Sequence, residues 1–283
     1  MSLRETLAQA VSRLAEAGVA SPEYDARELL AHTLDVRRDH LLVIDSLAPN
    51  EISPEQQAKF DDLISQRAQR VPLQHLTGVA GFRYIELAVG PGVFVPRPET
   101  ELLAGWAIER ASGLDQPVVV DLCTGSGAIA LSVADEVPTA QVAAVELDPA
   151  AHAWAERNLA GRVRLELGDM ATAFDELDGT VDVVTANPPY IPMEAWESVA
   201  VEARDFDPSL SLWSTGDGLD AMRVVEATAA RLLKTGGVVG AEHADAQGES
   251  APAVFAATGR WSDIRDHLDL AGRPRFVTAR LAR

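Results

Sequence analysis

The sequence predicts an α/β protein in which a doubly wound, mostly parallel sheet follows a small helical domain, and a β-hairpin joins the two. Three observations support this fold class. The first seventy or so residues carry apolar side chains at helical spacing. Residues 81–96 change to short β-prone pieces separated by glycine and proline. After Pro98, apolar runs of strand length alternate with helical segments, which is typical of a sheet covered on both faces.

The helical domain is predicted over residues 1–73 from apolar spacing and capping residues. Four apolar residues recur at helical spacing and form one stripe: Leu3, Leu7, Val11 and Leu14. Ser21-Pro22 and Ser53-Pro54 each place a hydroxyl before a proline suited to a first helical turn. Gln56 completes a capping box with the second of these serines.

The connector is predicted over residues 74–97. Its hairpin has strands at Phe82 to Val89 and Val93 to Val95, with Gly90-Pro91-Gly92 as the turn. The α/β domain follows over residues 98–283 and opens with a helix that carries four apolar residues, Leu102, Leu103, Trp106 and Ile108. Strands are expected after it at Val118 to Leu122, Val142 to Glu146, Val163 to Leu167, Val181 to Ala186 and Val238 to Glu242.

The composition limits the classes of partner. The chain has 283 residues and a formal net charge of -19. This acidity argues against a duplex-DNA or anionic-membrane surface, because such partners are held mainly through Lys and Arg. The single cysteine, Cys123, excludes an internal disulfide framework and is consistent with a reducing compartment. No apolar run reaches membrane-spanning length, so we expect a cytoplasmic protein, acting as a monomer.

A glycine loop follows the first strand of the α/β domain. Cys123, Thr124, Gly125, Ser126 and Gly127 lie between that strand and a helical segment. Glycines let the backbone approach a ligand closely, and a helix N-terminus offers unpaired N–H groups to an anionic group. The loop also matches the dinucleotide pattern G-x-G-x-x-A, so by itself it does not separate NAD from S-adenosylmethionine.

Polar residues at other strand ends complete the expected cofactor site. Asp121 lies where a carboxylate can meet the ammonium of a methionyl group, although it could instead only cap the turn. Glu146 ends the next strand, where its carboxylate can accept both ribose hydroxyls. Asp169 and Met170 follow a further strand, where a carboxylate can hold an adenine amino group and a thioether can cover the ring.

The residues Asn187, Pro188, Pro189 and Tyr190 follow an apolar run and so lie where a buried strand ends. The prolines fix φ and donate no N–H, which leaves the Asn187 side chain and the Pro188 carbonyl free to accept both N–H groups of a planar amide. Its lone pair would then face an incoming methyl carbon, and Tyr190 would stack on the flat group. We therefore expect methyl transfer to an amide or amine nitrogen, with Asn187, Pro188 and Tyr190 as catalytic residues.

These segments resemble the class I methyltransferases, and within them the protein release factor glutamine N5-methyltransferase family. The resemblance is carried by the glycine loop and N-P-P-Y, and by Phe94 to Glu101, Asp207-Pro208 and Glu242-His243. It implies a seven-stranded Rossmann-like domain that converts S-adenosylmethionine to S-adenosylhomocysteine. The methyl acceptor would be the glutamine of a Gly-Gly-Gln loop in peptide chain release factors. We also expect the helical domain to dock this protein substrate, because its helices are separate from the cofactor domain.

Carried over by residue, the resemblance implies that Cys123 to Gly127, Glu146, Met170 and Asn187 contact the cofactor. The bracket from Asn187 to Tyr190 would hold the glutamine. Two residues depart from the family pattern. Cys123 stands where the family usually has glycine, which predicts an ordinary φ there. Glu146 stands where aspartate is common and keeps the carboxylate.

Two residues of the connector and one late histidine have further expected roles. Phe94 and Arg97 are expected to contact the substrate, and Arg97 with Glu99 is also expected to brace the connector. His243 beside Glu242 offers too few ligands at recognised spacing for a metal site, and we predict no metal.

Rival functions remain open at this stage. A glutamine N5-methyltransferase acting on a ribosomal protein would share the N-P-P-Y bracket. An adenine N6-methyltransferase would also share it, but the chain has no basic block that could hold phosphates. A non-catalytic binding module would be expected to have lost the bracket, and an NAD-dependent oxidoreductase leaves the bracket unexplained.

Overall fold

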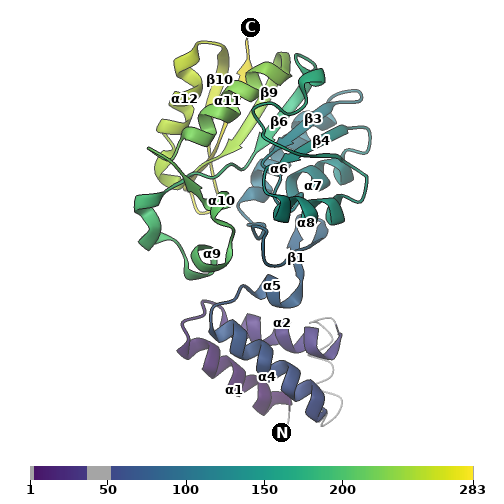
Figure 1. The fold of residues 1–283 in the computed structure, drawn as a ribbon, viewed down its shortest axis with the longest axis vertical. Coiled ribbons are helices and arrows are strands. Elements are labelled where there is room, and N and C mark those ends of the chain that lie inside the picture. Colours follow the sequence, from purple (N-terminus) through teal and green to yellow (C-terminus); the bar gives the residue numbers. More distant parts are fainter. Residues whose placement is uncertain (1–2, 37–51, 283) are drawn as a thin grey trace. The chain divides into compact units, whose positions relative to one another are not determined.

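The computed structural model describes residues 3–36 and 52–282 of the chain. The chain forms two compact units (Figure 1). One unit combines the chain up to Val79 with the short segment Ala200–Phe206, and the other combines Ala80–Val199 with Asp207–Arg283. The chain therefore passes between the units three times.

The first unit is helical, as the apolar spacing predicts. Its described helices are α1 (Leu3–Glu16), α2 (Pro22–Leu34), α4 (Pro54–Ala68), α5 (Leu73–Thr77) and α9 (Val201–Phe206). The predicted capping box at the start of α4 is confirmed: Gln56 N donates to Ser53 Oγ at 3.2 Å, and Ser53 N donates to Gln56 Oε1 at 3.1 Å. Leu14, Leu29 and Phe60 are fully buried at the centre of this unit.

Helix α9 joins the helical unit through ion pairs. Both oxygens of Glu202 accept hydrogen bonds from Arg70, at 2.7 and 2.6 Å, and Glu202 Oε1 accepts another from Arg67 at 3.0 Å. Arg67 also donates to Asp25 on α2 at 2.7 Å. A segment more than a hundred residues away in sequence thus becomes part of this unit.

The predicted hairpin exists, but its predicted turn is wrong. The strands are β1 (Val79–Phe82) and β2 (Ile85–Ala88), so the turn lies at Arg83-Tyr84. Gly90-Pro91-Gly92 follows the second strand, where the Trp154 indole donates to the Pro91 carbonyl at 3.2 Å. Residues 93–95 form no strand, and their two valines are buried in the core of the second unit.

The second unit contains a seven-stranded sheet in the order β10-β11-β9-β6-β3-β4-β5. Strands β5, β4, β3, β6 and β9 are parallel, and β11 is antiparallel to both β9 and β10. The strands are β3 (Val118–Leu122), β4 (Gln141–Glu146), β5 (Arg164–Leu167), β6 (Val181–Ala186), β9 (Leu233–Glu242), β10 (Trp261–Leu268) and β11 (Pro274–Leu281). The doubly wound α/β fold is therefore confirmed.

Helices cover both faces of this sheet (Figure 1). On β3, Val119 packs in one apolar layer with α6, α7 and α8, while Val120 packs in the opposite layer with α11 and α12. The long helices of the unit are α6 (Thr100–Ser112), α7 (Ala128–Glu136), α8 (Pro149–Leu159), α11 (Asp220–Leu232) and α12 (Ser250–Thr258).

Shorter elements complete the second unit. Two short strands beyond the main sheet, β7 (Ile191–Pro192) and β8 (Trp213–Ser214), pair with each other in parallel. The remaining short helices are η1 (Asp175–Leu177), η2 (Met193–Ser198), α10 (Ser209–Leu212) and η3 (Asp245–Gln247).

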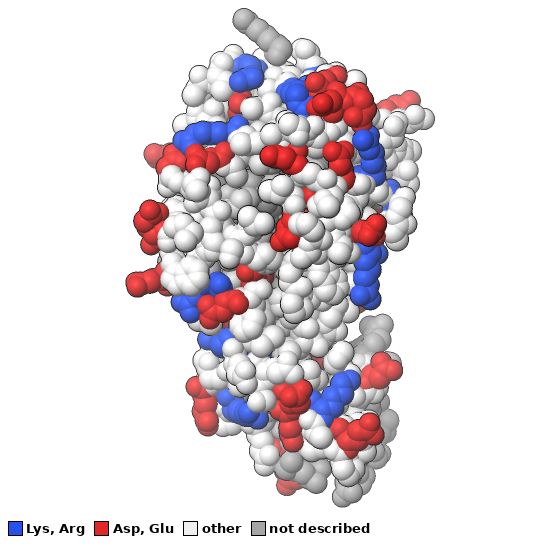
Figure 2. All heavy atoms as spheres, viewed as in Figure 1, with Lys and Arg blue, Asp and Glu red and all other residues white. Residues whose placement is uncertain are grey.

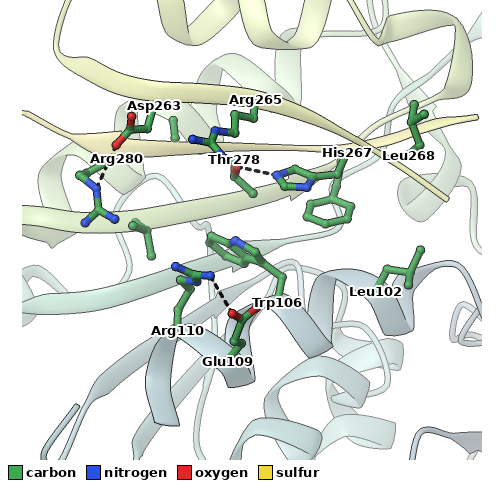
Figure 3. A pocket seen from close by; sticks show the side chains of 13 residues that line it. Leu102, Trp106, Glu109, Arg110, Asp263, Arg265, His267, Leu268, Thr278 and Arg280 are labelled. Atoms are coloured by element: carbon green, nitrogen blue, oxygen red, sulfur yellow. Dashed lines mark hydrogen bonds and ion pairs between the residues drawn. The ribbon is translucent and has the colours of Figure 1, made fainter. Parts of the chain in front are cut away.

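An open groove of about 500 Å³ lies where β10 and β11 meet α6 (Figure 3). His267 stacks on Phe276 with ring centroids 4.5 Å apart, and its Nε2 lies 2.8 Å from Thr278 Oγ1. Trp106 of α6 faces this pair across the groove. None of the lining residues belongs to the loops that follow β3, β4 or β6, so the groove is separate from the predicted site.

The visible surface of the described residues has no basic region of the kind that binds nucleic acid (Figure 2), as the acidic composition predicts. Figure 2 shows acidic and basic side chains interspersed on the visible face, without a continuous basic tract. Over residues 3–36 and 52–282, none of the helices combines the length and apolarity needed to span a bilayer.

Candidate active site

The carboxyl ends of β3, β4 and β6 lie side by side, because β3 pairs with both of the other strands. Asp121 is in register with Thr185, and Leu122 with Ala186. The glycine loop after β3 and the N-P-P-Y bracket after β6 therefore start from adjacent positions of one sheet edge. The chain order also reverses here, since β4 and β6 lie on opposite sides of β3. Ligands of open α/β sheets bind at such a point.

The glycine loop has the tight backbone that its sequence predicts. Gly125 and Gly127 have φ of 57° and 86°, in the left-handed region that glycine adopts without strain. A Cβ on Gly127 would lie 3.0 Å from a methyl carbon of Leu159, so a side chain would press against α8. The N–H of Gly125 donates to Glu146 Oε2 at 2.8 Å, which ties the loop to the end of β4.

Cys123 contradicts one expectation from the sequence. Its φ is 57°, so the residue adopts the left-handed conformation rather than an ordinary φ. The loop imposes this geometry, and a non-glycine residue there is strained by about 1 kcal/mol or more. Its sulfur lies 3.5 Å from the Met170 sulfur, and burial raises the pKa of the thiol, which keeps it neutral. This environment supports a packing role.

Asp121 is 1% exposed, and its carboxylate supports the glycine loop. Thr124 Oγ1 donates to one of its carboxylate oxygens and Thr185 Oγ1 to the other, both at 2.7 Å. Burial raises the pKa of Asp121 to about 6, against the two hydroxyl hydrogen bonds, which lower it. The carboxylate thus links β3, the glycine loop and β6. Its expected contact with a methionyl ammonium stays a prediction.

The other expected cofactor residues lie on neighbouring loops. Glu146 Oε1 accepts from the Asp148 N–H at 2.8 Å, and burial raises the pKa of the Glu146 carboxyl. Asp169 is exposed, and its Oδ1 accepts from Ala171 N at 2.9 Å, as in a turn. Met170 is half-buried and packs against the core layer of α11 and α12. Their ribose and adenine contacts stay predictions.

The N-P-P-Y bracket is held at both ends. Asn187 Nδ2 donates to Thr100 Oγ1 at 3.3 Å, and the Tyr190 hydroxyl donates to Glu242 Oε1 at 3.2 Å. The Tyr190 carbonyl accepts from Gln247 Nε2 at 3.2 Å. Pro188 is buried between these contacts. The bracket is therefore fixed to α6, β9 and η3.

Thr100 and Glu242 have contacts that sequence reasoning did not foresee. Thr100 Oγ1 donates to Glu242 Oε2 at 2.7 Å, although the two residues are 142 positions apart. The only sequence signal was their presence in the two segments that carried the family resemblance. Local spacing cannot reveal a hydrogen bond of this separation.

Arg97 braces the connector, one of the two roles expected for it. It donates to Asp207 Oδ2 at 2.6 Å, and its guanidinium carbon lies 4.8 Å from the centre of the Phe94 ring. The second Asp207 oxygen accepts from Val95 N at 3.4 Å. Burial raises the pKa of Asp207 to about 6, while Arg97 lowers it. Substrate contacts of Phe94 and Arg97 stay predictions.

His243 is a buried residue with both ring nitrogens engaged. Nε2 lies 3.0 Å from Asp266 Oδ1, and Nδ1 lies 2.9 Å from the Ala244 carbonyl. Within the described part of the chain, no three His, Cys, Asp or Glu side chains are grouped closely enough to hold a metal ion.

Comparisons with known proteins identify the family of this chain. A family model described as the PrmC N-terminal domain matches residues 5–78, and one described as a methyltransferase domain matches residues 119–206. The release factor glutamine methyltransferase of Streptomyces coelicolor is 53% identical over 98% of this chain and 97% of its own length. The chain belongs to the release factor glutamine methyltransferase family.

Relatives of the chain are not all named for the same substrate. The 4-amino-L-phenylalanine/4-methylamino-L-phenylalanine methyltransferase of Streptomyces pristinaespiralis is 41% identical over 92% of this chain and 89% of its own. Among solved structures, the hMettl16 catalytic domain in complex with the MAT2A 3'UTR hairpin 6 has a TM-score of 0.54 at 13% identity. It covers 78% of this chain and 82% of that one, and shows the class I methyltransferase fold alone.

Proposed function

We propose that this chain transfers a methyl group from S-adenosylmethionine to the side-chain amide N5 of a glutamine in the Gly-Gly-Gln loop of peptide chain release factors. One observation carries the proposal: the N-P-P-Y bracket and the glycine loop leave adjacent strands at one sheet edge. The named family of the chain's relatives supports the choice of acceptor.

The residues at this edge fit the cofactor's chemistry. The first turn of α7 offers N–H groups suited to its carboxylate, beside a glycine loop whose backbone a ligand can approach closely. Glu146 offers a carboxylate suited to the ribose hydroxyls, and Met170 a thioether suited to the adenine face. When bound, the cofactor supplies an electrophilic methyl group on a sulfonium.

The bracket prepares the acceptor nitrogen. An amide lone pair is delocalised into its carbonyl, so the nitrogen must be oriented to react. The Asn187 Oδ1 and the Pro188 carbonyl each accept one N–H, which points the lone pair at the methyl carbon. Such orientation can contribute several kcal/mol, up to roughly 7–11 in favourable cases. As the C–N bond forms and the C–S bond breaks, the sulfur keeps the electron pair and the nitrogen releases a proton to water.

Mass spectrometry of methylated acceptors tests the proposal. Purified release factors, ribosomal proteins and 4-aminophenylalanine are each incubated with the enzyme and S-adenosylmethionine. We expect one added methyl group, located on the glutamine of the Gly-Gly-Gln loop, and none on a release factor in which that glutamine is asparagine. Methylation of a ribosomal protein or of the aromatic amine instead would reject the proposed acceptor.

We further propose that the helical unit docks the protein substrate while the α/β unit performs the transfer. Its separation into a compact unit of its own supports this division. Deleting residues 1–70 should reduce methylation of intact release factors, while methylation of a short Gly-Gly-Gln peptide and cofactor binding persist. Equal losses on protein and peptide would contradict the docking role.

A further inference from the structure

A chain of hydrogen bonds lies behind the bracket. It runs from Asn187 Nδ2 to Thr100 Oγ1 at 3.3 Å, and from Thr100 Oγ1 to Glu242 Oε2 at 2.7 Å. The Tyr190 hydroxyl meets the other oxygen of Glu242 at 3.2 Å. Thr100 is 5% exposed and Glu242 is 2% exposed, so water cannot substitute freely for these partners.

The donor and acceptor properties of these groups fix the direction of the hydrogen bonds. A carboxylate only accepts hydrogen bonds, so Thr100 must use its single hydroxyl hydrogen on Glu242. The Thr100 oxygen can then only accept from Asn187. The Asn187 amide must therefore turn its NH2 group toward Thr100 and its Oδ1 away from it.

We infer that Thr100 and Glu242 are positioning residues that select which end of the Asn187 amide faces the methyl acceptor. This inference rests on the proposed function, in which Oδ1 accepts an N–H of the substrate amide. If the amide were reversed, its NH2 would meet the NH2 of the substrate, two donors would oppose each other, and the lone pair would lose its orientation.

Burial raises the pKa of the Glu242 carboxyl to about 6, so the group is still a carboxylate at neutral pH. The cationic side chain of Arg275, on the neighbouring strand β11, lowers this pKa. The Thr100 and Tyr190 hydrogen bonds also favour the charged form. The carboxylate is therefore the acceptor toward which both hydroxyl groups are directed.

Variants of Thr100 test the inference. Thr100→Val keeps the shape and removes the hydroxyl, and we expect kcat to fall about 10-fold to 100-fold, the range for losing a hydrogen bond that orients a reacting group. The KM for S-adenosylmethionine should change by less than about twofold, because Asn187 is the one expected cofactor residue to which the Thr100 side chain hydrogen-bonds. Thr100→Ser keeps the hydroxyl and should restore kcat to within about threefold.

The Glu242→Gln variant tests the direction of these hydrogen bonds. The amide is nearly isosteric, but its NH2 can donate to Thr100, which frees the Thr100 hydrogen to point at Asn187 and lets that amide reverse. We expect a kcat loss as large as for Thr100→Val. The matched control is Thr228→Val, a buried threonine of α11 on the opposite face of the sheet, which should leave kcat unchanged.

A readout without an acceptor separates this inference from the proposed reaction. The side-chain NH2 signal of Asn187, assigned by its loss in Asn187→Ala, should show a hydrogen-bonded proton in NMR spectra of the full chain. That shift should disappear in Thr100→Val and return in Thr100→Ser. Three results would each overturn the inference, whichever acceptor the enzyme methylates. These are a normal kcat in Thr100→Val, equal losses of kcat in Thr100→Val and Thr100→Ser, and an Asn187 NH2 signal that is the same in both variants as in the parent.

Discussion

At the scale of single residues, the sequence was most informative where chemistry depends on local spacing. The glycines of the loop and the N-P-P-Y bracket were predicted, because strand, turn and helix signals coincide there. The Thr100–Glu242 contact was not foreseen, because its partners are brought together only by the packing of α6 beside β9. The conformation of Cys123 was wrongly predicted, because the loop overrides the preference of the residue.

The strain at Cys123 can be measured by comparing two small replacements. Both Cys123→Gly and Cys123→Ala lose the thiol contact with Met170, but only glycine adopts a φ of 57° without cost. We expect the glycine variant to be more stable than the alanine variant by about 1 kcal/mol in urea unfolding. An alanine variant as stable as the glycine variant would show that the loop relaxes.

The Glu242 carboxylate should give the reaction a pH dependence. Burial raises its pKa to about 6, with Glu99 acting in the same sense, while Thr100, Tyr190 and Arg275 lower it. Protonation would let the carboxyl donate to Thr100, so the hydrogen bond between Thr100 and Asn187 would no longer have a fixed direction. We therefore expect kcat at saturating cofactor to fall as the pH drops through about 6.

The stability contribution of the same group has the opposite sign. The folded state holds its proton more tightly than the unfolded chain, so ionising Glu242 destabilises the fold as the pH rises from about 4.5 to about 6. Glu242→Gln should remove both the pH step in kcat and this stability change. A step near pH 6 that persists in the glutamine variant would assign it to another group.

At the scale of elements, strands with continuous apolar runs were predicted best. β3 and β6 have the predicted bounds, because both are buried on both faces. Neither β10 nor β11 was predicted from the sequence, because their polar residues break the simple alternation, and β10 also has register shifts against β11. The hairpin turn was misplaced because Gly-Pro-Gly is the strongest local turn signal, yet Arg83 makes the turn with a φ of 49°.

The loop before α11 offers a test of how firmly the bracket must be held. Gly218 and Gly216 both have positive φ, of 81° and 60°. A Cβ on Gly218 would lie 2.9 Å from the Tyr190 carbonyl oxygen, whereas the nearest atom to a Cβ on Gly216 is 3.5 Å away. Gly218→Ala should lower kcat at least about 10-fold by displacing the bracket. Gly216→Ala should cost about 1 kcal/mol of stability and leave kcat unchanged; equal kcat in both variants would contradict this.

The ion pairs of α9 should contribute to the stability of the helical unit. Glu202 is half-buried against Arg67 and Arg70. Burial raises the pKa of its carboxyl, but the hydrogen bonds from the two guanidinium groups outweigh this effect and lower the pKa to about 2. Glu202→Gln should reduce the free energy of unfolding by about 1–3 kcal/mol at pH 7, discounted for partial exposure. The matched control, Glu23→Gln at an exposed site of α2, should change the free energy of unfolding by only about 0.5 kcal/mol or less.

The pH dependence of this contribution follows from the lowered pKa. The Glu202 contribution is fully present above its unfolded pKa of about 4.5 and is lost as the pH falls toward 2. The difference in stability between the parent and Glu202→Gln should therefore shrink between those values. A difference that stays constant with pH would mean that the substitution acts through packing.

At the scale of the whole molecule, local pattern could not show how the chain is divided. Residues 200–206 come soon after the bracket in sequence, yet they belong to the helical unit through Glu202. Their assignment depends on two arginines more than 130 positions earlier, and no spacing rule connects them. The sequence order βαβ, in contrast, was enough to predict a doubly wound sheet, because parallel strands need such crossovers.

The overall charge predicts how the enzyme treats nucleic acids. A formal net charge of -19 and the interspersed acidic side chains in Figure 2 leave no basic tract on that face for a phosphate backbone. Transfer RNA or an adenine-containing DNA oligonucleotide should therefore neither accept a labelled methyl group nor slow methylation of release factors at about 0.15 M salt. Transfer to a release factor in the same reaction is the positive control. Labelled nucleic acid, or inhibition that weakens steeply as salt is raised, would instead show a phosphate-binding surface and favour the adenine N6-methyltransferase alternative.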